Sequence, residues 1–186
     1  MSSTATSAST ASTVAARVAP DHAATPHAYD AGLLLLRIAV GLTMAAHGAQ
    51  KLFGWFGGGG LDGTGKFFSS NGYPAGEAMA FVAGVTETFG GLALAVGLLT
   101  PLAGAAVVGT LLNAIAVKGT GAFFAPKGIE YELILTAAAA TLTLTGPGRY
   151  ALDRFVPVLR NHRLNYGLAA IVLALLAAGA VLVVRT

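Results

Sequence analysis

Long apolar stretches alternate along this chain with short polar or glycine-rich segments. A helix needs ~20 apolar residues to cross the ~30 Å hydrocarbon core of a bilayer, with ~17–25 tolerated. Five stretches are near this length: 31–50, 78–99, 102–117, 129–145 and 167–184. Little more than Thr100 and Pro101 separates the second stretch from the third, which predicts an antiparallel helical hairpin. The pattern therefore predicts an all-α membrane protein with five transmembrane helices.

The segments between these stretches predict where the helices begin and end. Asp30 precedes the first stretch and is a plausible N-cap. Aromatic residues and glycines fill residues 53–60, as is typical of a loop at the membrane interface, and residues 64–71 suit a short interfacial helix. Pro74 suits the start of the second long helix, and the Gly-Pro-Gly of residues 146–148 ends the fourth.

Three regions follow from this pattern. Residues 1–29 are rich in Ser, Thr and Ala and lack the apolar run of a signal peptide, so we expect a disordered tail. Residues 30–155 contain four of the predicted spans and form one membrane domain. Residues 156–186 provide a polar connection and a fifth, uniformly apolar transmembrane helix.

Composition excludes several classes of function. Charged residues make up only 10% of the chain, against roughly 25% in soluble domains. The net charge of +3 is not concentrated in a basic stripe, so nucleic acid is not an expected partner. The chain has no cysteine, so it can neither exchange thiols nor hold a thiolate-ligated cluster. No metal-binding spacing and no flavin or nicotinamide fingerprint is present, so we expect no metal and no covalently bound cofactor.

Because successive helices cross the membrane in opposite directions, the segments between them fall at two opposite ends of the protein, which we call X and Y. The X end receives the N-terminal tail, the Thr100 turn and the polar connection 149–163, and the Y end receives segments 51–73 and 118–128 and the C-terminus. Four arginines cluster in the polar connection, which favours a cytoplasmic X end. We therefore expect a multi-pass plasma-membrane protein with a cytoplasmic N-terminus and a C-terminus outside.

Glu87 is the most informative residue, because it lies in the middle of the second span. About 11 residues of helix place it ~16 Å deep, near the midplane. A carboxylate is costly in lipid and usually faces other helices or water. Further polar residues fall in the Y half of the other spans, and we expect them to share a pocket with Glu87: His47, Gln50, Lys51, Asn113, Lys118 and Glu132.

These residue types suit proton exchange with a bound redox molecule. A carboxyl group and an imidazole can move protons, which makes Glu87 and His47 the candidate catalytic residues. Lys51 and Asn113 could hydrogen-bond carbonyl oxygens, with Gln50 and Glu132 as further ligand-binding candidates. A quinone head group needs such a set, although a small polar solute could use it equally. The structural alternatives are an ion pair or interhelical hydrogen bond for Glu87, a hydrogen bond for His47 and a snorkelling Lys51.

Other polar residues suit structural roles. Arg37 lies about 10 Å into the X half of the first span, where it either snorkels or pairs with Asp153. Arg149 belongs to the same polar connection as Asp153. Gly84 and Gly91 lie on one face of the second span, and small residues there would let a neighbouring helix approach closely.

Three motifs together resemble the DoxX family of integral membrane proteins. They are His-Gly-Ala-Gln-Lys-Leu-Phe-Gly at 47–54, Glu-Thr-Phe-Gly-Gly-Leu-Ala-Leu-Ala-Val-Gly-Leu-Leu-Thr-Pro at 87–101 and Gly-Pro-Gly-Arg-Tyr-Ala-Leu-Asp at 146–153. The resemblance implies a four-helix membrane bundle. Some relatives are associated with membrane oxidoreductases, including a subunit of a thiosulfate:quinone oxidoreductase, and others work with soluble partners. The fifth span and the N-terminal tail depart from this pattern.

Two hypotheses for function follow. The first is an integral membrane subunit of an oxidoreductase, with a quinone-sized pocket between its helices and a soluble or membrane-bound partner subunit. The second is a non-enzymatic membrane scaffold or solute-binding module that recruits a partner protein. A small permease is a weaker third possibility, since the chain lacks the inverted repeat of many transporters.

Overall fold

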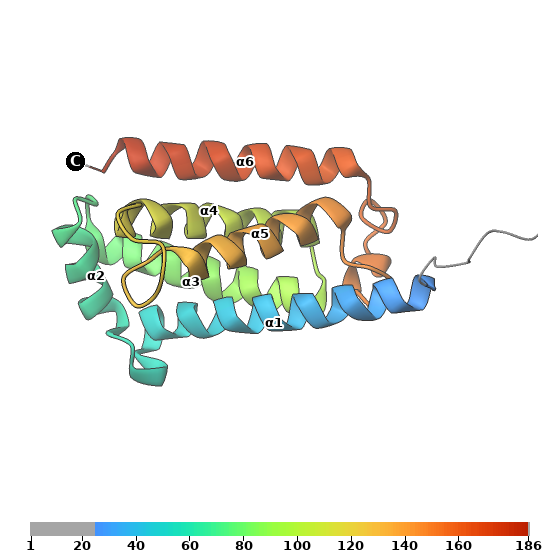
Figure 1. Cartoon of the computed structure of the whole chain (residues 1–186), viewed down its shortest axis with the longest axis horizontal. Coiled ribbons are helices and arrows are strands. Elements are labelled where there is room, and N and C mark those ends of the chain that lie inside the picture. Colours follow the sequence, from blue (N-terminus) through green and yellow to red (C-terminus); the bar gives the residue numbers. More distant parts are fainter. Residues whose placement is uncertain (1–24, 186) are drawn as a thin grey trace, which may run out of the picture.

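The computed structural model describes residues 25–185, and the tail expected to be disordered lies outside the described residues up to residue 24. All regular structure in the described part is helical (Figure 1). Six α-helices and two short 3-10 helices follow one another: α1 (Pro26–Phe53), η1 (Trp55–Gly57), α2 (Gly60–Ser70), α3 (Gly76–Val96), α4 (Thr100–Lys118), α5 (Glu130–Thr145), η2 (Leu152–Phe155) and α6 (Leu164–Val183). The predicted all-α fold is confirmed.

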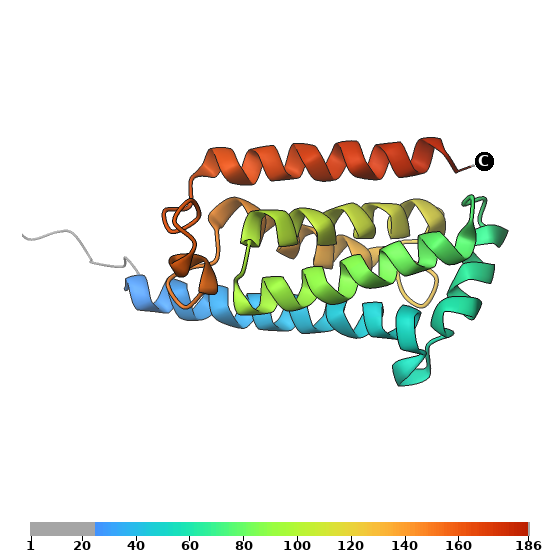
Figure 2. The same cartoon turned by 180° about the vertical axis from the view of Figure 1, so that it is seen from behind.

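Five of the α-helices form an up-and-down bundle (Figure 1). α1 packs on α3, α4 packs on α3 and α5, and α6 packs on α4 and α5. Viewed from behind, α4 lies between α3 and α6 (Figure 2). The short helix α2 lies across the Y end and packs on the start of α3. The described chain therefore begins at the X end and finishes at the Y end.

Glycines let α1 and α3 approach each other closely. A Cβ atom added at Gly41 or Gly91 would lie 2.5 Å from a backbone oxygen of the opposite helix. At Gly84 it would collide with the side chain of Leu52, 2.7 Å away. The expected close approach at Gly84 and Gly91 is confirmed. Close backbone contact of this kind replaces the hydrophobic driving force that helices lack in lipid.

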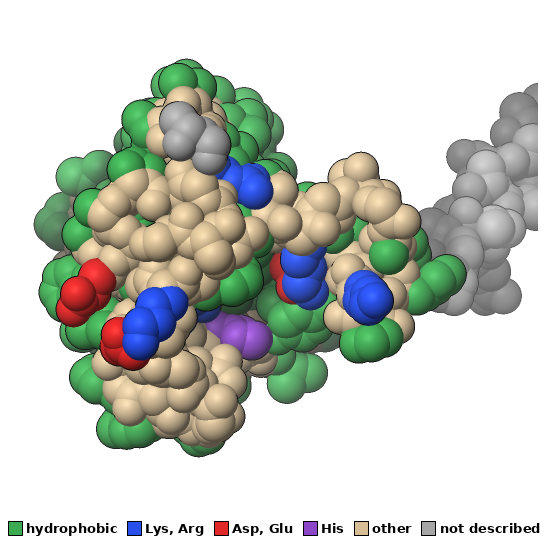
Figure 3. Space-filling model, turned by 90° about the vertical axis from the view of Figure 1, so that its left-hand side faces the viewer, with side chains coloured by type: hydrophobic (Ala, Val, Ile, Leu, Met, Phe, Trp, Pro, Cys, Tyr) green, Lys and Arg blue, Asp and Glu red, His purple; other side chains and the backbone are tan. Residues whose placement is uncertain are grey.

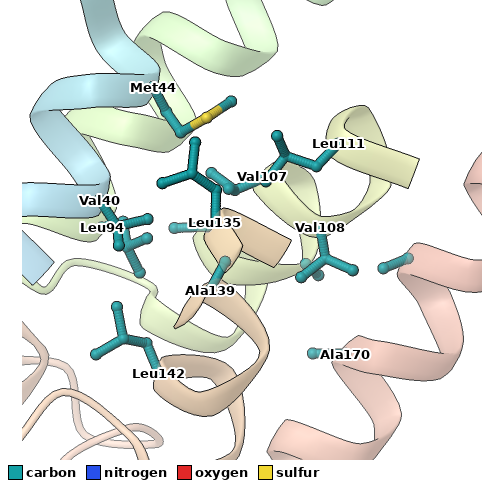
Figure 4. Close-up of a cluster of buried hydrophobic side chains, with 13 residues drawn as sticks. Val40, Met44, Leu94, Val107, Val108, Leu111, Leu135, Ala139, Leu142 and Ala170 are labelled. Atoms are coloured by element: carbon teal, nitrogen blue, oxygen red, sulfur yellow. The ribbon is translucent and has the colours of Figure 1, made fainter. Parts of the chain in front are cut away.

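The centre of the bundle is a cluster of aliphatic side chains from α1, α3, α4, α5 and α6 (Figure 4). Met44, Leu94, Val107 and Leu142 are at most 2% exposed within it. The outer faces are also apolar, with large exposed side chains such as Leu35, Phe81, Phe89, Ile134 and Leu176. A molecule that is apolar both inside and outside is suited to a lipid environment.

Within residues 25–185, four helices are long and apolar enough to cross a membrane: α1, α3, α4 and α6. α5 coincides with the fourth predicted span, but its 16 residues give it a length of about 24 Å. It is therefore a shorter member of the bundle, bracketed by the Lys118–Gly128 loop and the Gly146-Pro147-Gly148 turn. The multi-pass membrane architecture is as expected, but α5 is not among the four helices that are long and apolar enough to cross a membrane.

The expected helix starts need three corrections. Asp30 is not the N-cap of the first helix, because α1 begins at Pro26 and its N-cap position is Thr25. A proline in the first helical turn needs no backbone N–H partner, so it starts the helix one turn earlier than Asp30 would. α2 begins at Gly60, before residue 64, and α3 begins at Gly76 rather than Pro74.

Candidate functional site

Lys51 and Glu87 form an ion pair at the centre of the candidate site. Lys51 is in the last turn of α1, and Glu87 is in the middle of α3. The Lys51 Nζ atom lies 2.5 Å from Glu87 Oε2, with the side chains 23% and 8% exposed. The long aliphatic stem of Lys51 lets its ammonium reach inward from the helix end. The pair supplies one hydrogen-bond donor and one acceptor deep in an apolar region.

A cavity of about 430 Å³ lies beside this pair. Residues of α3, α4 and α6 line it, together with Phe67 and Phe68 of α2 at the Y end. Pockets of roughly 300–1,000 Å³ hold small organic molecules in proteins. Apolar side chains dominate the lining, which consists of Lys51, Phe67, Phe68, Tyr73, Met79, Val82, Ala83, Thr86, Glu87, Ala105, Ala106, Gly109, Thr110, Asn113, Ala114, Val117, Lys118, Ala177, Ala178 and Val181.

A second polar pair lines the cavity nearer the Y end. The Tyr73 hydroxyl donates to Asn113 Oδ1 at 3.3 Å, and Asn113 Nδ2 donates to the Gly109 carbonyl at 3.0 Å. Burial raises the pKa of the Tyr73 phenol above its usual value, although the nearby Arg185 opposes this effect. The hydroxyl therefore keeps its proton at physiological pH and acts as a donor. Asn113 is held in a fixed orientation by two neighbours.

Lys118 joins the cavity to a second ion pair. Its Nζ atom lies 2.6 Å from Glu132 Oε1 of α5 and donates to the Gly128 carbonyl at 3.3 Å. Lys118 also lines the cavity, whereas Glu132 does not. The end of the molecule that contains both ion pairs carries separate basic and acidic side chains on a largely uncharged surface (Figure 3).

The structure brings only part of the predicted set together. Glu87, Lys51, Asn113 and Lys118 line one cavity, as expected of a shared pocket. His47 lies outside the lining, with its Nε2 atom 3.0 Å from the Tyr131 hydroxyl. Gln50 is also outside and donates to the Phe56 carbonyl at 3.3 Å, which ties the end of α1 to the turn that follows it.

Sequence reasoning missed two contributions to the cavity. The first is Tyr73, which immediately precedes Pro74 and lies at the same membrane level as Asn113. The position of Tyr73 at the Y end could have identified it from the sequence as a candidate for the cavity. The second is the wall formed by Ala177, Ala178 and Val181 of α6. A stripe of small residues at helical spacing was the available sequence signal for the buried face of this helix.

The X end contains a different polar cluster. Arg37 is fully buried and donates from its Nη2 atom to the Tyr150 carbonyl at 2.6 Å. Asp153 is 1% exposed and accepts from the backbone N–H groups of Leu99 at 2.6 Å and Thr100 at 2.9 Å. Asp153 thus acts as a cap for the first turn of α4, where a carboxylate is favoured. Its negative charge also attracts the positive charge of Arg37, although the two side chains do not form a direct ion pair.

Asp30 and Arg149 complete the X-end cluster. Asp30 is 7% exposed and its Oδ1 atom accepts from the Arg149 backbone N–H at 2.9 Å. The Arg149 side chain itself is exposed. Arg37, Asp153 and Arg149 were expected to be structural. The side chains of Arg37 and Asp153 bond to backbone groups of the X-end turns, and the Arg149 backbone N–H donates to the Asp30 carboxylate of α1.

The comparisons with known proteins agree with this architecture. The sequence profile of the DoxX family matches residues 32–119. A protein of Bacillus subtilis (strain 168), named "Putative oxidoreductase CatD", is 36% identical over 129 residues, which cover 69% of this chain and 89% of that protein. No solved structure matches the chain.

This chain belongs to the DoxX family of membrane proteins. Both polar pairs of the cavity lie within the matched residues 32–119, whereas the wall supplied by α6 lies outside them. Within residues 25–185 no group of three His, Asp or Glu side chains could hold a metal ion.

Proposed function

We propose that this protein is an integral membrane subunit of a redox system and that its cavity binds a quinone. The observation that carries the proposal is the Lys51–Glu87 ion pair in the wall of a mostly apolar cavity of about 430 Å³. The name of the Bacillus subtilis relative, an oxidoreductase, supports the redox assignment.

The cavity offers what a quinone requires. A quinone has a flat apolar ring, an apolar tail and two carbonyl oxygens. The apolar lining suits the ring and tail, and Lys51 and Asn113 place hydrogen-bond donors on two of the elements that surround the space. α3 and α6 both pack on α4 and scarcely on each other, so the groove between them faces the surrounding lipid. A lipid-soluble molecule can reach the cavity through this side.

The polar residues of the cavity would have different roles toward a bound quinone. A bound quinone would supply two-electron carrier chemistry, with the electrons coming from a partner subunit. Lys51 would orient and polarise a carbonyl oxygen. The Glu87 carboxylate would take up protons one at a time and pass them to the reduced quinone, which needs two protons for its two electrons. The ion pair between Lys51 and Glu87 lets one proton shift without leaving a buried charge uncompensated. Asn113, fixed by Tyr73, would hold the second carbonyl.

Quinone titration of the purified protein in lipid nanodiscs tests this proposal. We expect saturable binding of a short-chain quinone, and at least a tenfold weaker affinity in both Lys51→Met and Glu87→Gln, because each removes a polar contact from the cavity. Lys66→Met is the matched control. Lys66 also pairs with a carboxylate, that of Asp62 at 2.7 Å, but both side chains are largely exposed on α2.

Two results would contradict the proposal. One is wild-type protein that shows no saturable binding, and the other is unchanged affinity in both cavity variants. A wild type that binds no quinone but retains a partner protein in mild detergent would instead support the scaffold hypothesis.

We also propose that the X end faces the cytoplasm in the plasma membrane. The arginine-rich connection between α5 and α6 lies at that end, and Arg149, Arg154 and Phe155 are exposed there. Clustered arginines are retained on the cytoplasmic side. A periplasmic or extracellular reporter fused to the C-terminus should be active, whereas a C-terminal reporter active in the cytoplasm would overturn this orientation.

A further inference from the structure

The helix α6 is attached to the bundle unevenly along its length. Its buried face consists entirely of small residues, namely Gly167, Ala170, Ala174 and Ala178. Its larger side chains, such as Leu173 and Leu176, are exposed. Small residues permit close contact but interlock little, so the strength of attachment depends on how near the backbones come.

The X end of α6 is pressed tightly against α5. A Cβ atom added at Gly167 would lie 2.5 Å from the Thr143 carbonyl oxygen. The ring of His162, just before α6, packs on Gly146, and its Nε2 atom donates to the Leu144 carbonyl at 2.9 Å. This end of α6 has no room to shift relative to α5.

Packing loosens toward the Y end. A Cβ atom added at Gly109 of α4 would meet the Ala174 carbonyl oxygen only at 3.6 Å, an ordinary contact distance. Beyond this point Ala177, Ala178 and Val181 line the cavity. The last turns of α6 thus border the space where the ligand is proposed to bind.

Arg185 holds this looser end in place. Its Nε atom donates to the Asn71 carbonyl at 2.7 Å, and its Nη1 atom donates to the Ala116 carbonyl at 3.1 Å. The guanidinium also lies 5.6 Å from the centre of the Tyr73 ring. One side chain therefore ties the end of α6 to the segment after α2, to α4 and to a residue of the cavity wall.

We propose that α6 is a movable wall of the cavity, which pivots near Gly167 and is held closed by Arg185. Release of Arg185 from the two carbonyls would let the Y half of α6 swing away from α4 and widen the lipid-facing side of the cavity. Arg185 then controls how fast ligands exchange rather than how tightly they bind. This proposal rests on the cavity being the ligand site proposed above.

Thiol labelling tests the motion without any ligand. The chain has no cysteine, so a single introduced cysteine is the only reactive thiol. Ala178→Cys places it on a position that is 4% exposed and lines the cavity. In that background we expect Arg185→Gln to raise the rate of reaction with N-ethylmaleimide about tenfold, because a glutamine amide can replace at most one of the two charge-assisted hydrogen bonds.

Two controls make the labelling result specific. Gly179→Cys lies next in sequence on the open side of α6, where a Cβ atom would meet nothing within 4 Å, so its labelling rate should not depend on Arg185. Arg185→Lys retains the positive charge at the Y end and should accelerate labelling at position 178 less than Arg185→Gln does. Equal acceleration at both cysteine positions would show general unfolding and would overturn the proposal.

Quinone kinetics separate this inference from the proposed function. We expect Arg185→Gln to increase the association and dissociation rates by a similar factor and to leave Kd within about twofold. Unchanged labelling at position 178 would overturn the movable wall even if the wild type binds quinone. Accelerated labelling in a protein that binds no quinone would support the movable wall and refute the quinone site.

Discussion

The two ends of the bundle both contain buried charged groups, but they use them differently. At the X end, the Asp30 and Asp153 carboxylates and the Arg37 guanidinium bond to backbone groups of the turns that connect the helices. At the Y end, lysines bond to glutamates, and the Lys51–Glu87 pair lies beside a cavity of about 430 Å³. Backbone partners fix a fold, whereas paired side chains beside open space remain available to a ligand.

The three DoxX motifs divide between these ends. The third motif, residues 146–153, joins the close of the second motif at Leu99 and Thr100 to form the X-end cluster. The first motif supplies Lys51, which meets Glu87 at the start of the second. One motif therefore serves both ends. The X-end motifs therefore meet through side chain–backbone bonds, and the Y-end motifs meet through an ion pair.

The largest loss of stability should come from a substitution in the X-end cluster. Asp153→Ala removes the acceptor for two backbone N–H groups and leaves Arg37 without a nearby negative charge. We expect a loss of about 3–5 kcal/mol in the free energy of unfolding, the usual result of removing one member of a buried charged set. Denaturant titration in detergent micelles measures it. Asp62→Ala, at an 81% exposed side chain, is the control and should change nothing. A loss under about 1 kcal/mol would contradict the role assigned to Asp153.

Gly97→Ala should be the next most damaging change. Gly97 has φ +68°, and a Cβ atom there would overlap the guanidinium of Arg37. We expect a cost of about 2 kcal/mol from backbone strain alone, with further loss from displacing Arg37. The control is Gly179→Ala, which meets nothing within 4 Å and should be neutral or slightly stabilising. Equal thermal stability of the two variants would show that Arg37 is not tightly confined.

At the Y end, variants of the Lys51–Glu87 ion pair should affect quinone affinity and protein stability differently. Glu87→Gln should cost about 2 kcal/mol of stability, between the values for exposed and buried pairs, while quinone affinity falls at least tenfold. The double variant Lys51→Met/Glu87→Leu removes both charges and should regain stability without regaining affinity. Thermal unfolding and quinone titration of the same samples measure both quantities. Recovery of binding in the double variant would mean that the ion pair does not contact the ligand.

Tyr73→Phe should have a smaller effect on the same site. The change removes the hydroxyl that donates to Asn113 Oδ1 at 3.3 Å and keeps the aromatic ring. We expect a stability loss of about 1 kcal/mol and an affinity loss of about threefold, because Asn113 becomes less well oriented. Asn113→Leu should then weaken binding more than Tyr73→Phe. The reverse order would show that Tyr73 contacts the ligand directly.

The smallest effect is expected for His47→Ala. His47 bonds to the Tyr131 hydroxyl outside the cavity, so quinone affinity should stay within about twofold of the wild type. The catalytic role suggested for His47 by the sequence is tested by the same variant. A tenfold loss of affinity or of quinone-dependent turnover would favour that role over the geometry described here.

Most of the fold is predictable from the sequence because lipid imposes strict lengths. The helices α3, α4 and α6 fall within a few residues of the predicted spans. The start of α1 was placed wrongly because Asp30 resembles a cap, while its carboxylate instead bonds to Arg149 more than a hundred positions later. Long-range contacts of this kind leave no local signature in the chain.

The sequence predicts how far along its helix each polar side chain of the site lies, but not which way the side chain points around the helix axis. Rise per residue correctly places Lys51, Glu87, Asn113 and Lys118 at one end of the bundle, where they line one cavity. It also places His47 there, since position along a helix says nothing about rotation around it. The separation of His47 from Lys51 depends on how α1 turns toward α3 and α5, which packing at Gly48 and Gly84 determines.

The closed X end has a bioenergetic consequence for the proposed redox role. Arg37 and Asp153 fill that end with groups bonded to backbone, and the cavity beside Glu87 is lined by Lys51 and Lys118 of the Y half. In the proposed redox role, protons would therefore reach Glu87 from the compartment at the Y end. An electron delivered from the opposite compartment and a proton taken from the Y side would meet near the middle of the low-dielectric layer. Together they would move about one charge across it, so the reduction would be electrogenic and its energy would change by ~2.3 kcal/mol for each 100 mV of transmembrane voltage.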